Sequence, residues 1–334
     1  MFLSSFAGKI GAPIATLLVF ASPASAAVVG ANAYLEGALR ARAAEPAQAV
    51  DPLDTGGTGS FDLTGTEDPA PGEGRLAAYR GLGTWVDMYD KGPWADPEGA
   101  VLKMTRKGVT TLYLQTANYA KPRRTPIFRP DRMERLIVAA HARGMKVVAW
   151  YLPSFRNLDK DWRRTRAALD FRTGDGQAFD SFGLDIESTK VGDISTRNSR
   201  LRTLSKKIRS KVGPSYPLTA IVPDVHTNYW PSFPYRMVDR HYDAFLPMGY
   251  FSYRVKTFKG AYRYTRDNIK AIRRRTDDRG VKIHPIGGIA GDVGDAAARG
   301  YVRAVKDTRV LGGSYYDFPI TTRSEWTILE RLAP

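Results

Sequence analysis

From residue 81 onward the chain alternates short apolar runs with longer amphipathic stretches. Eight apolar runs of strand length occur, at residues 82–89, 109–115, 146–152, 181–186, 218–222, 244–250, 281–289 and 311–316. The stretches between them predict eight helices, at residues 96–106, 131–143, 159–172, 195–212, 234–240, 261–275, 292–306 and 323–331. Successive runs start roughly 25 to 40 residues apart, the length of one strand, one helix and their loops. Eight such units predict an α/β protein with a closed (β/α)₈ TIM barrel.

The first 78 residues differ in composition from the rest. Lys9 is followed by an apolar run at residues 11–21 and by Ala24-Ser25-Ala26, the pattern of a secretory signal peptide with its cleavage site. This run is shorter than the ~20 apolar residues of a spanning helix, so we expect no membrane span after cleavage. Residues 27–78 are poor in large apolar side chains, which predicts a flexible linker. We therefore expect a signal peptide (1–26), a flexible linker (27–78) and a barrel (79–334), in a secreted or extracytoplasmic protein.

The chain is strongly basic, with 50 Lys and Arg against 34 Asp and Glu and a formal net charge of +16. The basic residues are scattered in clusters, mostly on predicted helices, and no recognition module or basic groove with interleaved aromatics accompanies them. We therefore expect no nucleic-acid partner. The charge favours association with anionic envelope polymers through a long-range field.

Several chemistries lack their sequence signals. There is no cysteine, which excludes thiol catalysis and disulfides. The four histidines form no His-x-His or His-Glu-x-x-His pair, no Gly-x-Ser-x-Gly elbow occurs, and no Gly-rich phosphate loop follows the first run. We accordingly predict neither a metal site nor a cofactor.

The fourth apolar run carries the only concentrated chemistry. Within Leu184-Asp-Ile-Glu187, Asp185 and Glu187 are two apart on a strand and share one face, while the two apolar residues share the other. In a barrel of this kind the working residues sit at the carboxyl ends of the strands. Two close carboxylates in a partly desolvated site should not ionise independently, which suits one of them to general acid catalysis.

The segment Asp180-Ser-Phe-Gly-Leu-Asp-Ile-Glu187 resembles the fourth-strand signature of family 18 (chitinase-like) glycoside hydrolases, Asp-Gly-x-Asp-x-Asp-x-Glu. The resemblance implies that Glu187 is the proton donor and that Asp185 assists the substrate's acetamido group. Pro247-Met-Gly-Tyr250 is similar to that family's Met-x-Tyr-Asp element, in which Tyr250 would steady the same group. Two family acids are replaced in this chain, by Gly183 and Phe251.

Other segments extend the resemblance over most of residues 81–334. Residues 83–89, 111–115 and 147–153 and the Leu-Asp-Ile-Glu element together resemble the glycoside-hydrolase-like barrels of secreted actinobacterial proteins. This resemblance implies the barrel fold and carries no established substrate.

Further candidate residues lie near the ends of the apolar runs. Acidic residues also follow the first, fifth and eighth runs, at Asp87, Asp90, Asp224 and Asp317. The candidates for a second catalytic acid are Asp87, Asp317 and Asp180. A second acid about 5 Å from Glu187 would indicate a retaining mechanism and one at about 6.5 to 9.5 Å an inverting one. Aromatic rings and amides at these ends predict sugar contacts, and the candidates are Trp85, Gln115, Tyr151, Tyr250 and Tyr316.

Two functions are compatible with these features. The first is a secreted glycoside hydrolase that cleaves O-glycosidic bonds of a cell-envelope or environmental polysaccharide by carboxylate general acid/base catalysis. The second is a non-catalytic glycan-binding barrel, which the replacements at positions 183 and 251 favour. Both predict a polysaccharide or glycan as the partner.

Overall fold

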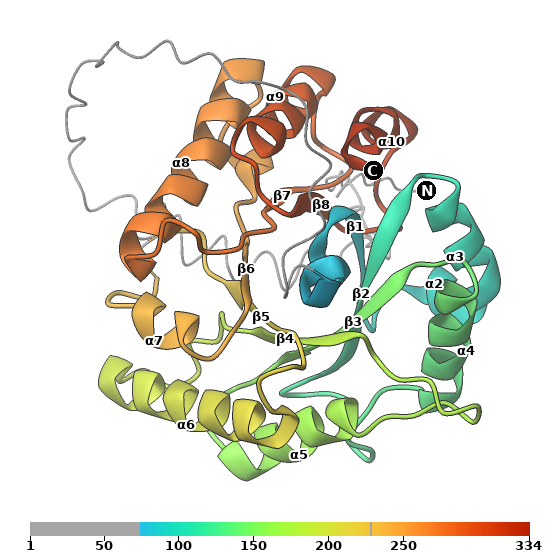
Figure 1. Cartoon of the computed structure of the whole chain (residues 1–334), viewed down its shortest axis with the longest axis vertical. Coiled ribbons are helices and arrows are strands. Elements are labelled where there is room, and N and C mark those ends of the chain that lie inside the picture. The colour runs from blue at the N-terminus through green and yellow to red at the C-terminus, as the bar shows by residue number, and fades with distance from the viewer. Residues whose placement is uncertain (1–73, 228) are drawn as a thin grey trace, which may run out of the picture.

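Eight parallel strands form the centre of the structure, a computed structural model that describes residues 74–227 and 229–334. They are β1 (Gly81–Val86), β2 (Val109–Asn118), β3 (Lys146–Leu152), β4 (Ser181–Asp185), β5 (Leu218–Val222), β6 (Ala244–Pro247), β7 (Ile286–Ile289) and β8 (Gly312–Tyr316). Their order is β6-β5-β4-β3-β2-β1-β8-β7. Single bridges from Phe245 to Ile283 and from Met248 to Ile286 join the two ends of the sheet. The ring is therefore nearly closed (Figure 1), which confirms the predicted (β/α)₈ barrel.

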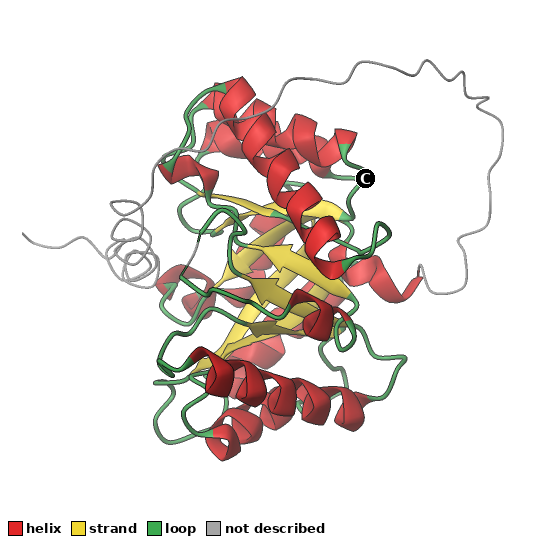
Figure 2. Ribbon diagram, turned by 90° about the vertical axis from the view of Figure 1, so that its left-hand side faces the viewer, coloured by secondary structure: helices red, strands yellow, loops and turns green. Residues whose placement is uncertain are grey.

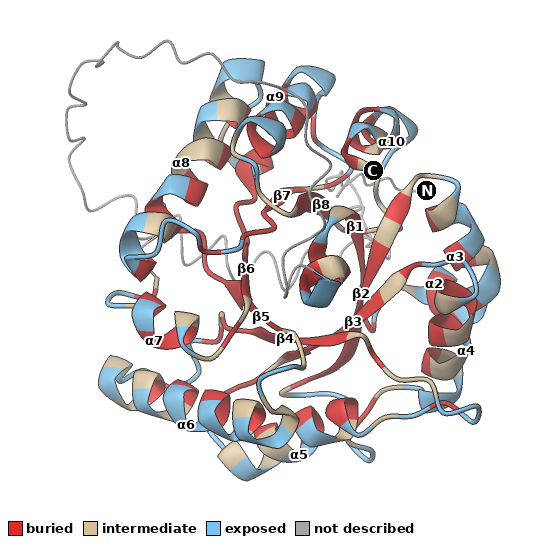
Figure 3. Cartoon of the chain, viewed as in Figure 1, coloured by how far each residue is buried: buried red, intermediate tan, exposed pale blue. Residues whose placement is uncertain are grey.

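Helices surround this ring on its outer side (Figures 1 and 2). They are α2 (Lys91–Ala95), α3 (Pro97–Thr105), α4 (Pro130–His141), α5 (Leu158–Leu169), α6 (Ile194–Val212), α7 (Tyr235–Asp239), α8 (Phe258–Thr276), α9 (Asp295–Asp307) and α10 (Arg323–Leu329). Exposed residues cover their outer faces, whereas the strands are almost entirely buried (Figure 3). No helix among the described residues is long and apolar enough to cross a membrane.

Local sequence signals set several of the helix ends. Asn157 begins α5 by accepting a 2.8 Å hydrogen bond from the Lys160 amide, and Thr322 with Glu325 forms a reciprocal capping box at α10. Gly108 and Gly144 lie after α3 and α4 with φ of 70° and 71°, a left-handed conformation that glycine adopts without steric cost. Each of these glycines ends its helix shortly before the next strand, β2 or β3, begins.

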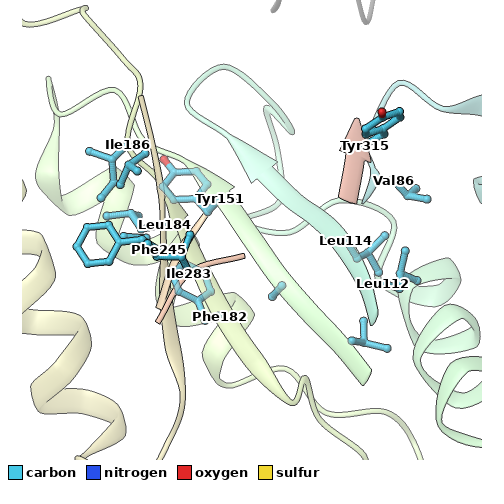
Figure 4. Packing of buried hydrophobic residues seen from close by; sticks show 14 of the residues in the cluster. Val86, Leu112, Leu114, Tyr151, Phe182, Leu184, Ile186, Phe245, Ile283 and Tyr315 are labelled. Carbon is cyan, nitrogen blue, oxygen red and sulfur yellow. The ribbon is translucent and has the colours of Figure 1, made fainter. Parts of the chain in front are cut away.

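The strands carry apolar residues on both faces, which produces two hydrophobic cores. The outer core lies between strands and helices and includes Phe182, Leu184 and Ile186 of the β4 segment (Figure 4). The inner core fills the barrel itself. Its members come from nearly every strand and from the segment before β1, and include Leu76, Tyr79, Trp85, Tyr113, Val148, Trp150, Ile221, Leu246 and Ile286.

A short 3₁₀ helix, η1 (Gly74–Tyr79), precedes β1 and packs into the inner core; it is the blue segment in the middle of the ring in Figure 1. The Tyr79 hydroxyl forms a hydrogen bond with Ser181 Oγ at the start of β4, and His284 Nδ1 donates to the Tyr79 carbonyl at 2.8 Å. Burial lowers the pKa of His284 to about 4, so its imidazole is neutral and structural. Residues 74–78, assigned to the linker from the sequence, are thus part of the barrel. The expected signal peptide and the rest of that linker lie outside the described residues.

Candidate active site

Two groups of carboxylic acids lie at the carboxyl ends of the strands, all at the same end of the barrel because the strands are parallel. Asp185 and Glu187 come from the end of β4. Asp87 and Asp90 follow β1, and Asp317 follows β8, which is hydrogen-bonded to β1. The electrostatic interactions that raise carboxyl pKa values stay within each group.

The β4 pair occupies the inner face of the barrel. Leu184 and Ile186 pack in the outer core, so the strand's alternation directs Asp185 inward. The Ile186 amide donates a 2.8 Å hydrogen bond to the Ile221 carbonyl, which continues the pairing with β5 beyond Asp185 and directs Glu187 to the same side. Asp185 is only 5% exposed, and among the described residues its Oδ1 atom has no hydrogen-bond partner. Glu187 is half-buried.

Burial governs the ionisation of this pair. It raises the pKa of Glu187 to about 7. It also raises the pKa of Asp185 well above its usual range, and the neighbouring Glu187 charge adds to that increase. The pair therefore retains a proton near neutral pH and titrates as a unit. A carboxylic acid still protonated near neutral pH is what general acid catalysis requires.

The second group brings together residues from the two ends of the barrel sequence. One carboxylate oxygen from each of Asp87, Asp90 and Asp317 lies within 4.8 Å of the others. Asp87 accepts hydrogen bonds from the Tyr316 hydroxyl at 2.6 Å and the Tyr89 amide at 2.6 Å, and Asp90 accepts one from the Asp87 amide at 2.7 Å. Burial and mutual repulsion raise the pKa of Asp90 to about 9 and that of Asp317 to about 7, although weak interactions with the Ile320 and Asp317 amides offset part of the latter.

Trp85 lies beneath this rim, inside the barrel. Its indole is stacked on Tyr113 with ring centroids 4.3 Å apart, and its N–H donates to Ser314 Oγ at 2.9 Å. The side chain is 1% exposed. The structure therefore gives Trp85 a packing role in the inner core, in place of the expected sugar contact.

Three other candidates lie at the rim. Tyr316 is half-buried and binds Asp87 through its hydroxyl, and its ring centroid is 6.5 Å from that of Tyr250. Gln115 is buried, and its Oε1 accepts a 3.1 Å hydrogen bond from the Met88 amide. Gln115 thus holds the loop that carries Asp87, while the two tyrosine rings make an edge contact beside it, with Tyr250 buried in the inner core.

Two candidates lie elsewhere. Asp180 precedes β4 and so lies at the opposite end of the barrel from Glu187, where it accepts hydrogen bonds from His141 (2.8 Å), Lys146 (3.0 Å) and the Val147 amide (2.8 Å). Tyr151 points outward from β3 into the outer core, because Trp150 beside it takes the inner face. Its hydroxyl donates to Asp161 at 2.6 Å. Neither a second acid at 180 nor a sugar contact at 151 is compatible with these positions.

Asp224 follows β5, and both of its carboxylate oxygens accept hydrogen bonds. It accepts hydrogen bonds from the Tyr264 hydroxyl, from Asn268 Nδ2 at 2.8 Å and from the His226 amide at 2.9 Å. The sequence did not indicate these partners, because Tyr264 and Asn268 lie on α8, 40 and 44 residues further along the chain. Asp224 therefore anchors α8 to the rim.

Comparison with other proteins supports the architecture. No protein-family model matches the sequence, and no relative is found among curated proteins. Solved structures do match. The endo-1,4-beta-mannanase of Rhizomucor miehei aligns with a TM-score of 0.58 at 10% identity, over 80% of this chain and 96% of that chain. A chitinase from the same organism gives 0.53 at 15% identity, over 76% and 99%. A chitinase of Bacteroides thetaiotaomicron gives 0.57 at 11% identity, over 76% and 95%.

These proteins share the barrel with this chain at sequence identities too low to carry residue roles across. The comparison shows the (β/α)₈ barrel fold alone, and the acids of this chain must be interpreted from their own geometry.

Proposed function

We propose that this chain is an exported hydrolase of O-glycosidic bonds in a cell-envelope or environmental polysaccharide, with Glu187 as its general acid/base. The observation that carries the proposal is the Asp185–Glu187 pair at the mouth end of β4, buried at Asp185 and half-buried at Glu187, with pKa values raised by burial. Its likeness in fold to mannanases and chitinases supports a glycan as the substrate class.

The residues divide the chemistry as follows. Protonated Glu187 donates its proton to the glycosidic oxygen while the bond from that oxygen to the anomeric carbon breaks. Water adds to the anomeric carbon and gives its proton to a carboxylate of the pair, which restores the starting state. Asp185 lies on the same strand face as Glu187 and is the proposed partner that assists this proton transfer, while burial raises the pKa of both carboxyls. Tyr316 and Tyr250, whose rings are in edge contact, would contact the sugar ring.

The activity should depend on pH through Glu187. General acid catalysis requires the protonated carboxyl, and its population falls as pH rises through a pKa of about 7. We expect kcat/KM to decline above that pH and to approach a tenfold loss per pH unit. A pH profile of polysaccharide hydrolysis measures this decline. A rate that stays constant up to about two pH units above that pKa would contradict the role of Glu187.

One observation favours a second function, that of a glycan-binding barrel without turnover. A Cβ atom at Gly183 would lie 3.0 Å from Thr219 Cγ2 and 3.3 Å from Ile221 Cδ1, so the acid that family 18 carries there would fit only if these neighbours moved by a few tenths of an ångström. Phe251 is fully buried in the outer core, so it also contributes nothing acidic to the mouth. In this case tryptophan fluorescence would report glycan binding equally in wild type and Glu187→Gln, with no reducing ends released.

Export is a separate part of the proposal. It rests on Lys9, the apolar run at residues 11–21 and the Ala24-Ser25-Ala26 site. Expression of the full chain in a secreting bacterial host should yield mature protein outside the cytoplasm that begins at Ala27. N-terminal sequencing of that protein tests the site, and a product retaining Met1 in the cytoplasm would contradict export.

A further inference from the structure

The proposed acid catalysis by the β4 pair does not account for the group formed by Asp87, Asp90 and Asp317. These side chains come from the β1–α2 loop and from the end of β8, and one oxygen of each lies within 4.8 Å of the other two. Among the described residues, none of the three forms an ion pair with a lysine, arginine or histidine. Three carboxylates thus converge without a protein cation to balance them.

Asp317 is the most unusual member. It is fully buried, and neither of its carboxylate oxygens makes a hydrogen bond of ordinary geometry within the described part of the chain. Burying a carboxylate without a partner is expensive. Because an oxygen of Asp317 is directed at Asp87 and Asp90, the missing partner belongs between these three residues.

The donor set restricts the partner. Three carboxylate oxygens without histidine or cysteine favour a hard cation over zinc. Their separations, all within 4.8 Å, are compatible with one ion bound by all three. Mg²⁺ is usually held by one or two carboxylates and keeps several waters, whereas Ca²⁺ takes roughly six to eight oxygen ligands, so three converging protein carboxylates match Ca²⁺ better.

We propose that Asp87, Asp90 and Asp317 bind a Ca²⁺ ion at the mouth of the barrel. The ion joins the β1–α2 loop to the end of β8. Asp87 is oriented by hydrogen bonds from the Tyr316 hydroxyl and the Tyr89 amide. Gln115 accepts a hydrogen bond from the next amide, that of Met88, and so fixes the same loop. Asp90 is half-buried, which leaves the loop side open to solvent for entry of the ion and for its water ligands. The inference is independent of the proposed hydrolysis.

Calorimetric titration of the EDTA-treated, purified full chain with CaCl₂ tests this proposal. We expect one bound Ca²⁺ per chain and a Tm increase of roughly 5 °C at a hundredfold excess over Kd. Asp317→Asn should abolish both the heat of binding and the Tm shift, because it removes an anionic ligand. Asp131→Asn, which changes an exposed acid on α4, should bind as the wild type does.

Asp90→Asn provides a second variant, since Asp90 is half-buried and its replacement disturbs the core least. It should fold and lose most of the affinity. Three outcomes overturn the site: no binding by the wild type up to about 10 mM Ca²⁺, binding of Mg²⁺ or Mn²⁺ with Ca²⁺ inert, or unchanged Ca²⁺ affinity in the folded variants.

Discussion

Glu187→Gln is expected to lower kcat for polysaccharide hydrolysis by about 10²- to 10⁴-fold, the usual contribution of a general acid. Glutamine has nearly the same shape as glutamate and cannot donate the carboxyl proton to the leaving oxygen. Reducing-end release by equal amounts of wild type and variant measures the loss. Glu98→Gln is a matched control, because Glu98 is an exposed residue that pairs with Arg135 on the outer surface.

The same substitution should leave the fold intact. The folded-state pKa of Glu187 is raised to about 7 from an ordinary 4.5, so its contribution to stability is fully present at low pH and is lost as pH rises through about 7. Glutamine removes this loss. At pH values above 7 we therefore expect the variant to match or exceed the wild type in unfolding free energy, by on the order of 1–2 kcal/mol. Full activity in a correctly folded variant would reject Glu187 as the acid.

Trp85→Ala is expected to have the largest effect on stability. The indole fills the inner core against Tyr113 and donates to Ser314, so its removal leaves a cavity and an unpaired hydroxyl. The expected loss is about 3–5 kcal/mol of unfolding free energy. Urea unfolding followed by circular dichroism measures it. Phe258→Ala, at an exposed aromatic on α8, should change the value by less than about 1 kcal/mol.

This result also separates the two roles considered for Trp85. A sugar-stacking ring at the mouth would lose glycan affinity on truncation while the fold kept its stability. A variant of that kind, stable and weak in binding, would contradict the position of Trp85 in the inner core.

The pattern of apolar runs was sufficient to predict the barrel. The bounds of β3 and β5 agree with the runs at 146–152 and 218–222. The last part of the pattern was less accurate at β7, which begins at Ile286 although the run begins at 281. Residues before it contact β6 only through the bridge at Ile283, and Pro285 cannot donate to a ladder.

The site was partly predictable, and the reason lies in the patterning of each strand. In β4 the acids alternate with Leu184 and Ile186, so their shared face can be read from the sequence. In β3 the residues at both faces are apolar, as buried parallel strands require, and nothing in the sequence indicated that Trp150 faces inward and Tyr151 outward. For the same reason, the sequence did not indicate that Trp85 points into the barrel.

The grouping of Asp87 and Asp90 with Asp317 depends on closure of the barrel. These residues stand near opposite ends of the barrel sequence, and only the pairing of β1 with β8 brings them together. Sequence motifs for metal sites, such as histidine pairs, have short spacing, and a set of acids gathered from distant strand ends has no such motif.

The most direct test of the proposed function compares the purified wild-type protein with the Glu187→Gln variant. Both are incubated with a panel of polysaccharides that includes mannan, chitin and peptidoglycan, and the release of reducing ends is measured. The account predicts new reducing ends on at least one polysaccharide with the wild type, and none above background with the variant. Equal release by both proteins, or glycan binding by both with no release on any member of the panel, would contradict it.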